Sequence, residues 1–149
     1  DCSYNKLTTL DYRPEIVNGS FNCFDNELEN IENSPKIVKG DFNCGNNKLE
    51  TLENSPKEIN GNFYCYKNKL KTLENSPQKI KGSFICNNNK LTSLENSPLE
   101  LGKFFYCYKN PLESLDGYNL PYNKLPMEDK DRLVLKHKRS KKLKILDTL

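Results

Sequence analysis

Cysteine recurs at a constant interval of 21 residues along most of this chain, and this interval restricts the fold more than any other feature. The chain has 149 residues and six cysteines, which are Cys2, Cys23, Cys44, Cys65, Cys86 and Cys107. A repeat of about 20 to 50 residues is typical of a solenoid, because one short unit cannot bury its own apolar side and must stack on its neighbours.

Other residue types keep the same spacing. Around Cys86, Phe84 stands two residues before the cysteine, and Asn89, Leu91 and Leu94 follow it; all have counterparts in neighbouring repeats. Phenylalanine and cysteine alternate with other residues, which predicts a short strand in each repeat. Stacked repeats would join these strands into a parallel sheet, with strands about 4.8 Å apart. We expect a crowded or left-handed backbone at the recurring glycines Gly19, Gly40, Gly61 and Gly82.

These columns resemble the leucine-rich repeat family, whose signature is Leu-x-x-Leu-x-Leu-x-x-Asn-x-Leu. The second to fifth marked places are occupied by Phe84, Cys86, Asn89 and Leu91. Leu94 and Pro98 look like the short convex side of bacterial members. The resemblance covers residues 2 to about 117, and it is nearest to short repeats of bacteriophage and other viral proteins of unknown role. Two departures are that phenylalanine and cysteine replace leucines, and that Ile80 stands four rather than three residues before Phe84.

The resemblance implies a right-handed coil with a parallel β-sheet on its concave face and few or no convex helices. It also implies that the asparagine column bonds the backbone of adjacent coils. Elementary energetics favour the same role, because an unpaired buried polar group costs about 1 to 3 kcal/mol.

The chain divides into a solenoid of about six coils, residues 1–126, and a basic C-terminal segment, residues 127–149. Regularity fails after Cys107, and the last segment holds eight basic and four acidic side chains. We expect it to form a helical cap in which Leu133, Val134 and Ile145 cover the last coil. A second interpretation is that the segment also binds nucleic acid or another polyanion, through Lys136, Lys138, Arg139, Lys141, Lys142 and Lys144.

The N-terminal end begins midway through a repeat at Asp1 and Cys2, with no secretory signal in view. Either residues precede Asp1, or the open strand edge is expected to meet another chain, because bare edges invite pairing. No run of about 18 apolar residues exists, so the sequence predicts no membrane span.

Three readings compete for the cysteines: a metal site, disulfide bonds between coils, and a buried row of small apolar side chains. Zinc sites favour closely spaced pairs, which this chain lacks. Parallel strands in register aim their Cβ atoms the same way, which suits disulfide geometry poorly. We therefore expect buried thiols, no metal or other cofactor, and a reducing, cytoplasmic setting.

No pattern in the sequence predicts catalysis. His137 is the only histidine, it lies in a run of lysines, and no motif ties it to a nucleophile. The recurring glutamates belong to the repeated phrase Glu-Asn-Ser-Pro, which indicates a turn. We expect a protein that is not an enzyme.

The strand residues beside phenylalanine and cysteine should face outward on the concave wall. Early repeats place mostly small polar residues there, whereas later ones place aromatic, apolar and basic ones. This predicts a partner-binding surface formed by Phe24, Tyr64, Tyr66, Lys67, Ile85, Tyr106, Tyr108 and Lys109. The same tyrosines would also stabilise a sheet without any partner, by about 0.2 to 1 kcal/mol per pair. Single-stranded nucleic acid is a third reading, weakened because residues 1–126 hold 15 basic and 16 acidic side chains.

The sequence therefore predicts a protein-binding module of viral or phage type, working in the cytoplasm of a host cell if viral, with a protein as its partner. The alternative is a structural component of a virion or larger assembly, which would use the open N-terminal edge and the basic tail as contacts. Binding of nucleic acid by the basic tail is the remaining alternative.

Overall fold

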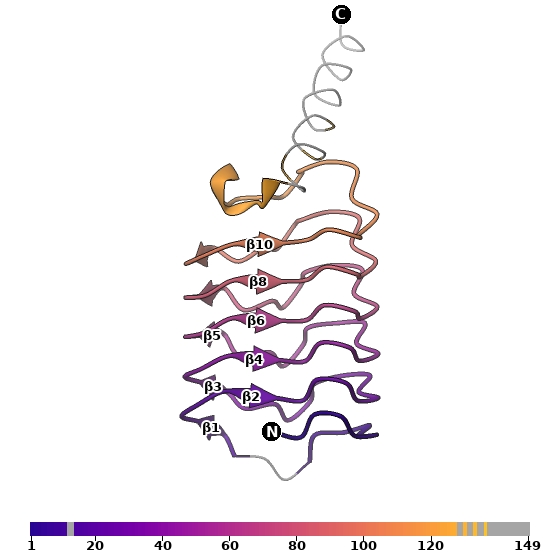
Figure 1. The fold of residues 1–149 in the computed structure, drawn as a ribbon, viewed down its shortest axis with the longest axis vertical. Coiled ribbons are helices and arrows are strands. Elements are labelled where there is room, and N and C mark those ends of the chain that lie inside the picture. The colour runs from indigo at the N-terminus through magenta and orange to yellow at the C-terminus, as the bar shows by residue number, and fades with distance from the viewer. Residues whose placement is uncertain (12–13, 128–129, 131–132, 134–135, 137–149) are drawn as a thin grey trace, which may run out of the picture.

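The chain folds as a parallel β-solenoid in which 21-residue coils stack along a nearly straight axis (Figure 1). The computed structural model describes residues 1–11, 14–127, 130, 133 and 136. Parallel pairing joins residues 21 apart, for example Phe42 with Phe63 and Phe63 with Phe84. The predicted repeat solenoid is thus confirmed.

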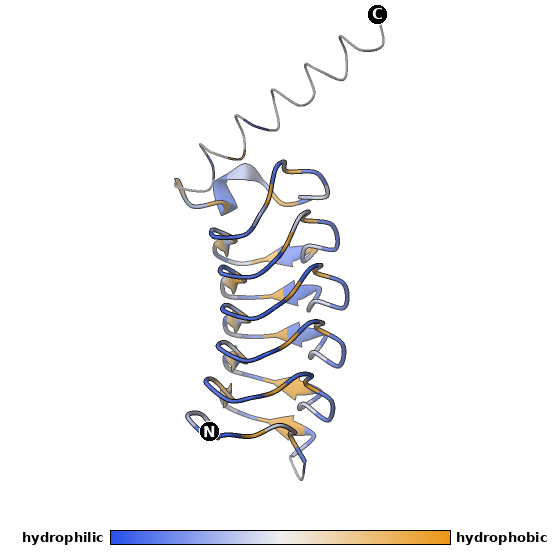
Figure 2. Ribbon diagram, turned by 90° about the vertical axis from the view of Figure 1, so that its right-hand side faces the viewer, coloured by the Kyte–Doolittle hydropathy of each residue, from blue (hydrophilic) through white to orange (hydrophobic). Residues whose placement is uncertain are grey.

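Each coil contributes two strands of two residues, which form two sheets on opposite sides of the stack (Figures 1 and 2). The odd sheet contains β1 (Ile16–Val17), β3 (Ile37–Val38), β5 (Glu58–Ile59), β7 (Lys79–Ile80) and β9 (Glu100–Leu101). The even sheet contains β2 (Phe21–Asn22), β4 (Phe42–Asn43), β6 (Phe63–Tyr64), β8 (Phe84–Ile85) and β10 (Phe105–Tyr106). All neighbouring strands in both sheets are parallel.

The even sheet matches the strand that the sequence predicts in each repeat, whereas the odd sheet was not predicted. Each odd strand buries a single apolar side chain, such as Ile59 or Ile80, and the residue before it faces outward. A pattern of one apolar residue is too short to show the alternation that identifies a strand. The departure at Ile80 from the leucine-rich repeat signature marks this second strand.

The core is built from five apolar side chains per coil. In one coil these are Ile59, Phe63, Cys65, Leu70 and Leu73, which are at most 1% exposed. The phenylalanines of successive coils contact one another, with ring centroids 5.2 to 5.6 Å apart. Because full burial of one large apolar side chain is worth about 1.5 to 3 kcal/mol, this repeated core is the main stabilising contribution.

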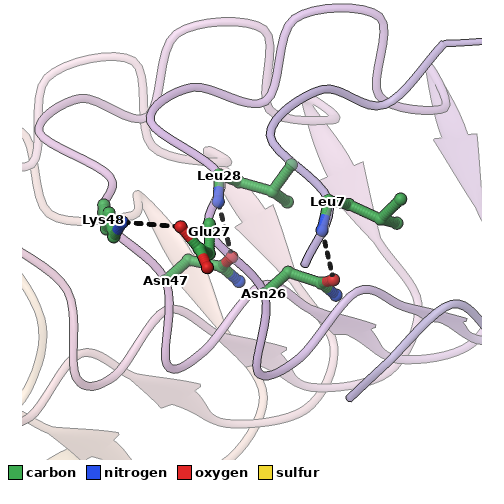
Figure 3. A network of polar contacts seen from close by, with 6 residues as sticks. All are labelled: Leu7, Asn26, Glu27, Leu28, Asn47 and Lys48. Carbon is green, nitrogen blue, oxygen red and sulfur yellow. Dashed lines mark hydrogen bonds and ion pairs between the residues drawn. The ribbon is translucent and has the colours of Figure 1, made fainter. Parts of the chain in front are cut away.

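The asparagine column is the polar counterpart of this core, and its predicted bonding is confirmed (Figure 3). The Oδ1 atom of Asn47 accepts the Leu28 backbone N–H of the previous coil at 3.0 Å, and Asn26 does the same for Leu7. The Nδ2 atom of Asn47 donates to the carbonyl of Cys23 in that previous coil and to the carbonyl of Cys44 in its own. Each asparagine therefore satisfies backbone groups that no strand pairs.

Along the stack, glycine occupies positions where the backbone is crowded, and asparagine occupies positions with a left-handed backbone. Gly61 belongs to a crowded column, because a Cβ atom there would lie 2.6 Å from the carbonyl carbon of Gly40 in the previous coil. The left-handed conformation is taken instead by asparagines of the Glu-Asn-Ser-Pro turn, such as Asn75 and Asn96 with φ of 62°. Gly117 takes the equivalent place in the next coil with φ of 78°, so the repeat continues beyond Cys107.

Beyond the last even strand, the phenylalanine stack ends on Tyr118, whose ring lies 5.6 Å from that of Phe105. Leu120, Leu125 and Leu133 are buried in the same hydrophobic cluster, and a short 3-10 helix spans Tyr122–Lys124. The helical cap predicted for residues 127–149 falls largely outside the described residues, as do Val134 and Ile145. In the part of the chain that is described, no helix has the length and apolar character needed to cross a membrane.

Candidate partner-binding face

The outer surface of the even sheet carries the predicted partner-binding residues. Tyr64, Ile85 and Tyr106 are the second residues of β6, β8 and β10, and the register places each beside the next. All three are partly buried. We call this surface the aromatic face and define it by Phe24, Tyr64, Tyr66, Ile85, Tyr106 and Tyr108.

Gly45 allows the aromatic side chains of this face to touch across a coil. Ring atoms of Tyr66 lie 2.8 to 3.1 Å from the place where a Cβ atom of Gly45 would stand, so the ring covers the glycine. The ring of Phe24, two coils from Tyr66, then lies 5.8 Å from that of Tyr66. Tyr4 and Tyr64 extend the row, at 5.3 Å from Phe24 and 6.5 Å from Tyr66 respectively. The result is a continuous row of four rings.

Phe24 was predicted to belong to this surface, whereas Tyr4 was not. Phe104, which is 47% exposed and lies 6.2 Å from Tyr106, was not predicted either. The signal for the row was present in the 21-residue alignment, where Gly45 stands between Phe24 and Tyr66 in one column. Only a small residue at the middle position lets two rings in alternate coils meet.

A second polar ladder runs beside the aromatic face and fixes its backbone. The side chains of Ser20, Asp41, Asn62 and Ser83 each accept the backbone N–H of the equivalent residue in the next coil, at 2.7 to 3.3 Å. The Nδ2 atom of Asn62 also donates to the Tyr64 hydroxyl at 3.1 Å. The Tyr64 ring is therefore held in place by a side chain that is itself part of the ladder.

Two hydroxyl groups of the face, those of Tyr64 and Tyr66, stay neutral in the ordinary pH range. Burial raises the pKa of Tyr64, and the nearby carboxylate of Asp41 raises it further. Burial also raises the pKa of Tyr66, with smaller contributions from Tyr4 and Tyr64. These phenols consequently stay protonated and can donate hydrogen bonds to a bound partner.

Charge is distributed unevenly along the edge of this face. Four exposed lysines lie at the corner that follows the even sheet in the later coils, and we call them the lysine corner: Lys67, Lys69, Lys90 and Lys109. None of the four forms an ion pair with any residue that the structure describes.

Acidic residues lie at the other end of the same edge. Asp25 accepts a hydrogen bond from Asn46, and Glu27 pairs with Lys48 at 2.9 Å (Figure 3). Asp41 lies at the opposite end of the even strands, immediately before β4, and does not belong to this edge. The edge therefore carries both signs of charge in the early coils, where Lys6 and Lys48 accompany Asp25 and Glu27, and only lysines at the lysine corner.

The cysteines form a buried row, as expected. Five of the six are fully buried, Cys2 is partly buried, and no disulfide bond joins any of them in the described part of the chain. The thiol of Cys44 donates to the Tyr64 carbonyl of the next coil at 3.3 Å. Burial raises the pKa of Cys44 and Cys65 well above its usual value, and neighbouring thiols add to the effect. A thiol that is held in its protonated form is a poor nucleophile, because the thiolate is the reactive form.

The basic tail contributes little to the described structure. Lys136 is exposed, whereas Lys138, Arg139, Lys141, Lys142 and Lys144 lie outside the described residues. His137 lies outside them as well. The second interpretation of the tail, polyanion binding, stays a prediction.

The odd sheet carries an open groove of about 770 Å³ over β5, β7 and β9. Glu58, Lys79 and Glu100 line it in register, and Lys79 pairs with Glu100 at 3.4 Å. The first residue of the odd strands changes from isoleucine in β1 and β3 to glutamate or lysine in β5, β7 and β9 (Figure 2). Because opposite charges alternate along the groove, it lacks the net charge and the aromatic anchors of the aromatic face.

Comparison with models of known protein families, with curated proteins and with solved structures found no match to this chain.

Proposed function

We propose that the chain is a protein-binding module without catalytic activity, which recognises its partner through the aromatic face. The observation that carries the proposal is the continuous row of partly exposed rings, from Tyr4 through Phe24 and Tyr66 to Tyr64. Large aromatic side chains contribute most of the binding energy at protein interfaces. Their hydroxyl groups add directional hydrogen bonds.

The geometry of the face suits recognition better than stabilisation alone. Tyr66 covers the backbone at Gly45 and fills no interior space, since the core is already closed by the phenylalanine and cysteine columns. The second polar ladder holds the sheet rigid, which lowers the entropy cost of binding.

We also propose that the chain is related to the leucine-rich repeat family. The asparagine and leucine columns support this relationship. The buried cysteine row, which contains no disulfide bond in the described part of the chain, supports a reducing compartment, such as the cytoplasm of a host cell. The rival role, a component of a virion or larger assembly, would use the N-terminal strand edge and the basic tail as contacts.

A random peptide library displayed on phage and selected against the immobilised chain tests the proposal. We expect enriched peptides to share a motif and to lose binding when Tyr64, Tyr66, Tyr106 and Tyr108 are all changed to serine. The matched control changes Ile37 and Leu99, which are 47% and 68% exposed and lie on the side of the odd sheet, to serine. Thermal melts of both variants establish that they are folded.

Two outcomes would refute the proposal. One is a library that yields no enriched motif at all. The other is a set of selected peptides that bind the tyrosine variant as tightly as the unchanged chain.

A further inference from the structure

We propose that the partner presents an acidic, extended segment that lies along the stack, with carboxylates over the lysine corner and apolar groups on the rings of the aromatic face. This inference rests on the proposed function and names the chemistry of the partner.

The first argument is the unneutralised charge of the lysine corner. Lys67, Lys69, Lys90 and Lys109 occupy three successive coils, and neighbouring coils in a parallel sheet lie about 4.8 Å apart. Like charges placed side by side in this way repel each other. Elsewhere on the surface the chain pairs equivalent positions with opposite charges, as in Lys48 with Glu27. Carboxylates supplied by a partner would complete the same arrangement at the corner.

The second argument is the direction in which the segment must run. Tyr66 and Tyr108 stand in one column, two coils apart, and Lys67 and Lys109 stand directly beside them in the next. Both columns run along the stack. The strands of the even sheet are only two residues long, and each interior strand is already paired on both sides. A peptide therefore cannot add as another strand on this face and must cross the strands.

The third argument is the spacing of the charges. Lys67 and Lys109, two coils apart, are separated by about 10 Å along the stack, from the strand spacing of a sheet. A polyproline II segment rises about 3.1 Å per residue and repeats every three residues, so its side chains at i and i+3 lie about 9 Å apart on one side. Such segments bind surfaces lined by aromatic rings. Acidic residues three apart would therefore meet both lysines.

The charges at the early end of the same edge favour a peptide over a nucleic acid. Asp25 and Glu27 lie there, beside Lys6 and Lys48. A uniform polyanion that ran along the whole edge would meet these two carboxylates as well as the lysines. A peptide can carry carboxylates at one end only.

The experiment is fluorescence anisotropy with a labelled (Glu-Pro-Pro)3 peptide and the full chain. We expect binding at least tenfold tighter than that of (Gln-Pro-Pro)3. We expect a similar loss when Lys67, Lys69, Lys90 and Lys109 are changed to glutamine. The matched control removes the same charge from the flanks of the odd strands, by changing Lys36, Lys39, Lys57 and Lys81 to glutamine, and should change the affinity less than twofold.

Three results would overturn the inference. They are equal affinity for the two peptides, no binding of (Glu-Pro-Pro)3 up to millimolar concentration, and unchanged binding by the variant of the lysine corner. Tighter binding of a labelled nine-residue oligo-dT, lost in that variant, would assign the corner to nucleic acid instead. If the peptide library still yields neutral ligands that need the tyrosines, the proposed function stands and only this inference fails.

Discussion

Replacement of Asn89 by alanine removes one interior member of the asparagine column. Its Oδ1 atom accepts the Leu70 backbone N–H at 3.0 Å, and its Nδ2 atom donates to the carbonyls of Cys65 and Cys86, both at 3.0 Å. All three bonds are buried.

The magnitude follows from which groups would lose their only side-chain partner. The Cys65 carbonyl keeps a bond from Asn68, and the Cys86 carbonyl keeps one from Asn110. The Leu70 N–H is left without an acceptor in a buried position, which costs about 1 to 3 kcal/mol. We therefore expect the free energy of unfolding to fall by about 2 kcal/mol.

Asn5 provides a control in the same column. It is exposed, and its Nδ2 atom donates only to the nearby carbonyls of Cys2 and Ser3. Asn5→Ala should lower the free energy of unfolding by less than about 0.5 kcal/mol, as surface changes usually do. Urea denaturation followed by circular dichroism, with the change in midpoint converted to free energy, measures both variants.

An aspartate at the same position separates the contribution of the amide oxygen from that of the amide nitrogen. Asn89→Asp keeps an acceptor for the Leu70 N–H but turns a carboxylate oxygen toward two carbonyls, so burial and repulsion raise the pKa of the new carboxyl group. The folded state then binds the proton more tightly than the unfolded chain does. The free energy of unfolding of this variant should accordingly increase as the pH is lowered from 7 to 5, relative to the unchanged chain.

Two results would refute this reasoning. The first is a loss for Asn89→Ala no larger than that for Asn5→Ala. The second is an Asn89→Asp variant that is as stable as the unchanged chain at pH 7. Either would mean that the asparagine ladder accompanies the solenoid without stabilising it.

Three further predictions test other parts of the structure. Gly61→Ala should lower the free energy of unfolding by about 1 to 3 kcal/mol, because its Cβ atom would overlap the backbone of the previous coil. The control is Gly19→Ala, since a Cβ atom at Gly19 meets nothing within 4 Å. Equal urea midpoints for the two variants would contradict the explanation. Gly45→Ala should displace the Tyr66 ring, because the new Cβ atom would lie 2.8 Å from the nearest ring atom. The affinity for library-selected peptides should fall severalfold, with little change in melting temperature. Unchanged affinity in anisotropy titrations would show that the row of rings is not part of the binding surface. Burial raises the pKa of Cys65, so its thiol should react with a disulfide reagent at pH 8 only at the rate of unfolding. The free energy of unfolding should decline as the pH rises past the usual thiol pKa, because the unfolded chain releases the proton first. Rapid labelling of native protein, detected by peptide mapping, would contradict a buried thiol row.

Part of the fold could be predicted from the sequence because it depends on residue type at a fixed period. The cysteine, phenylalanine and leucine columns identify the residues that stacking buries, and from Phe21 through Leu115 the structure buries all of them. The buried asparagine column follows from the need to pair backbone groups that a short coil leaves outside its strands. The odd sheet was not predictable in this way, since a strand that buries one side chain has no alternation to detect.

The candidate site was predicted less completely, for a related reason. The 21-residue period determines which residues face outward, and it places Tyr64, Ile85 and Tyr106 side by side, as the structure has them. The direction in which a flexible ring lies does not follow from the period. The Tyr66 ring lies over Gly45 toward Phe24, and Phe24 in turn contacts Tyr4.

By itself, the sequence of this protein determined that it is a stack of 21-residue coils with thiols, benzyl rings and amides inside, because a strict period leaves one arrangement that buries every apolar column at once. Only the tertiary structure decided which outward groups touch, which charges remain without a partner in the described chain, and that a second sheet closes the coil. Those features follow from the distances between coils and from side-chain rotamers. Both are determined by the neighbours of a residue in space and not by its position in the repeat.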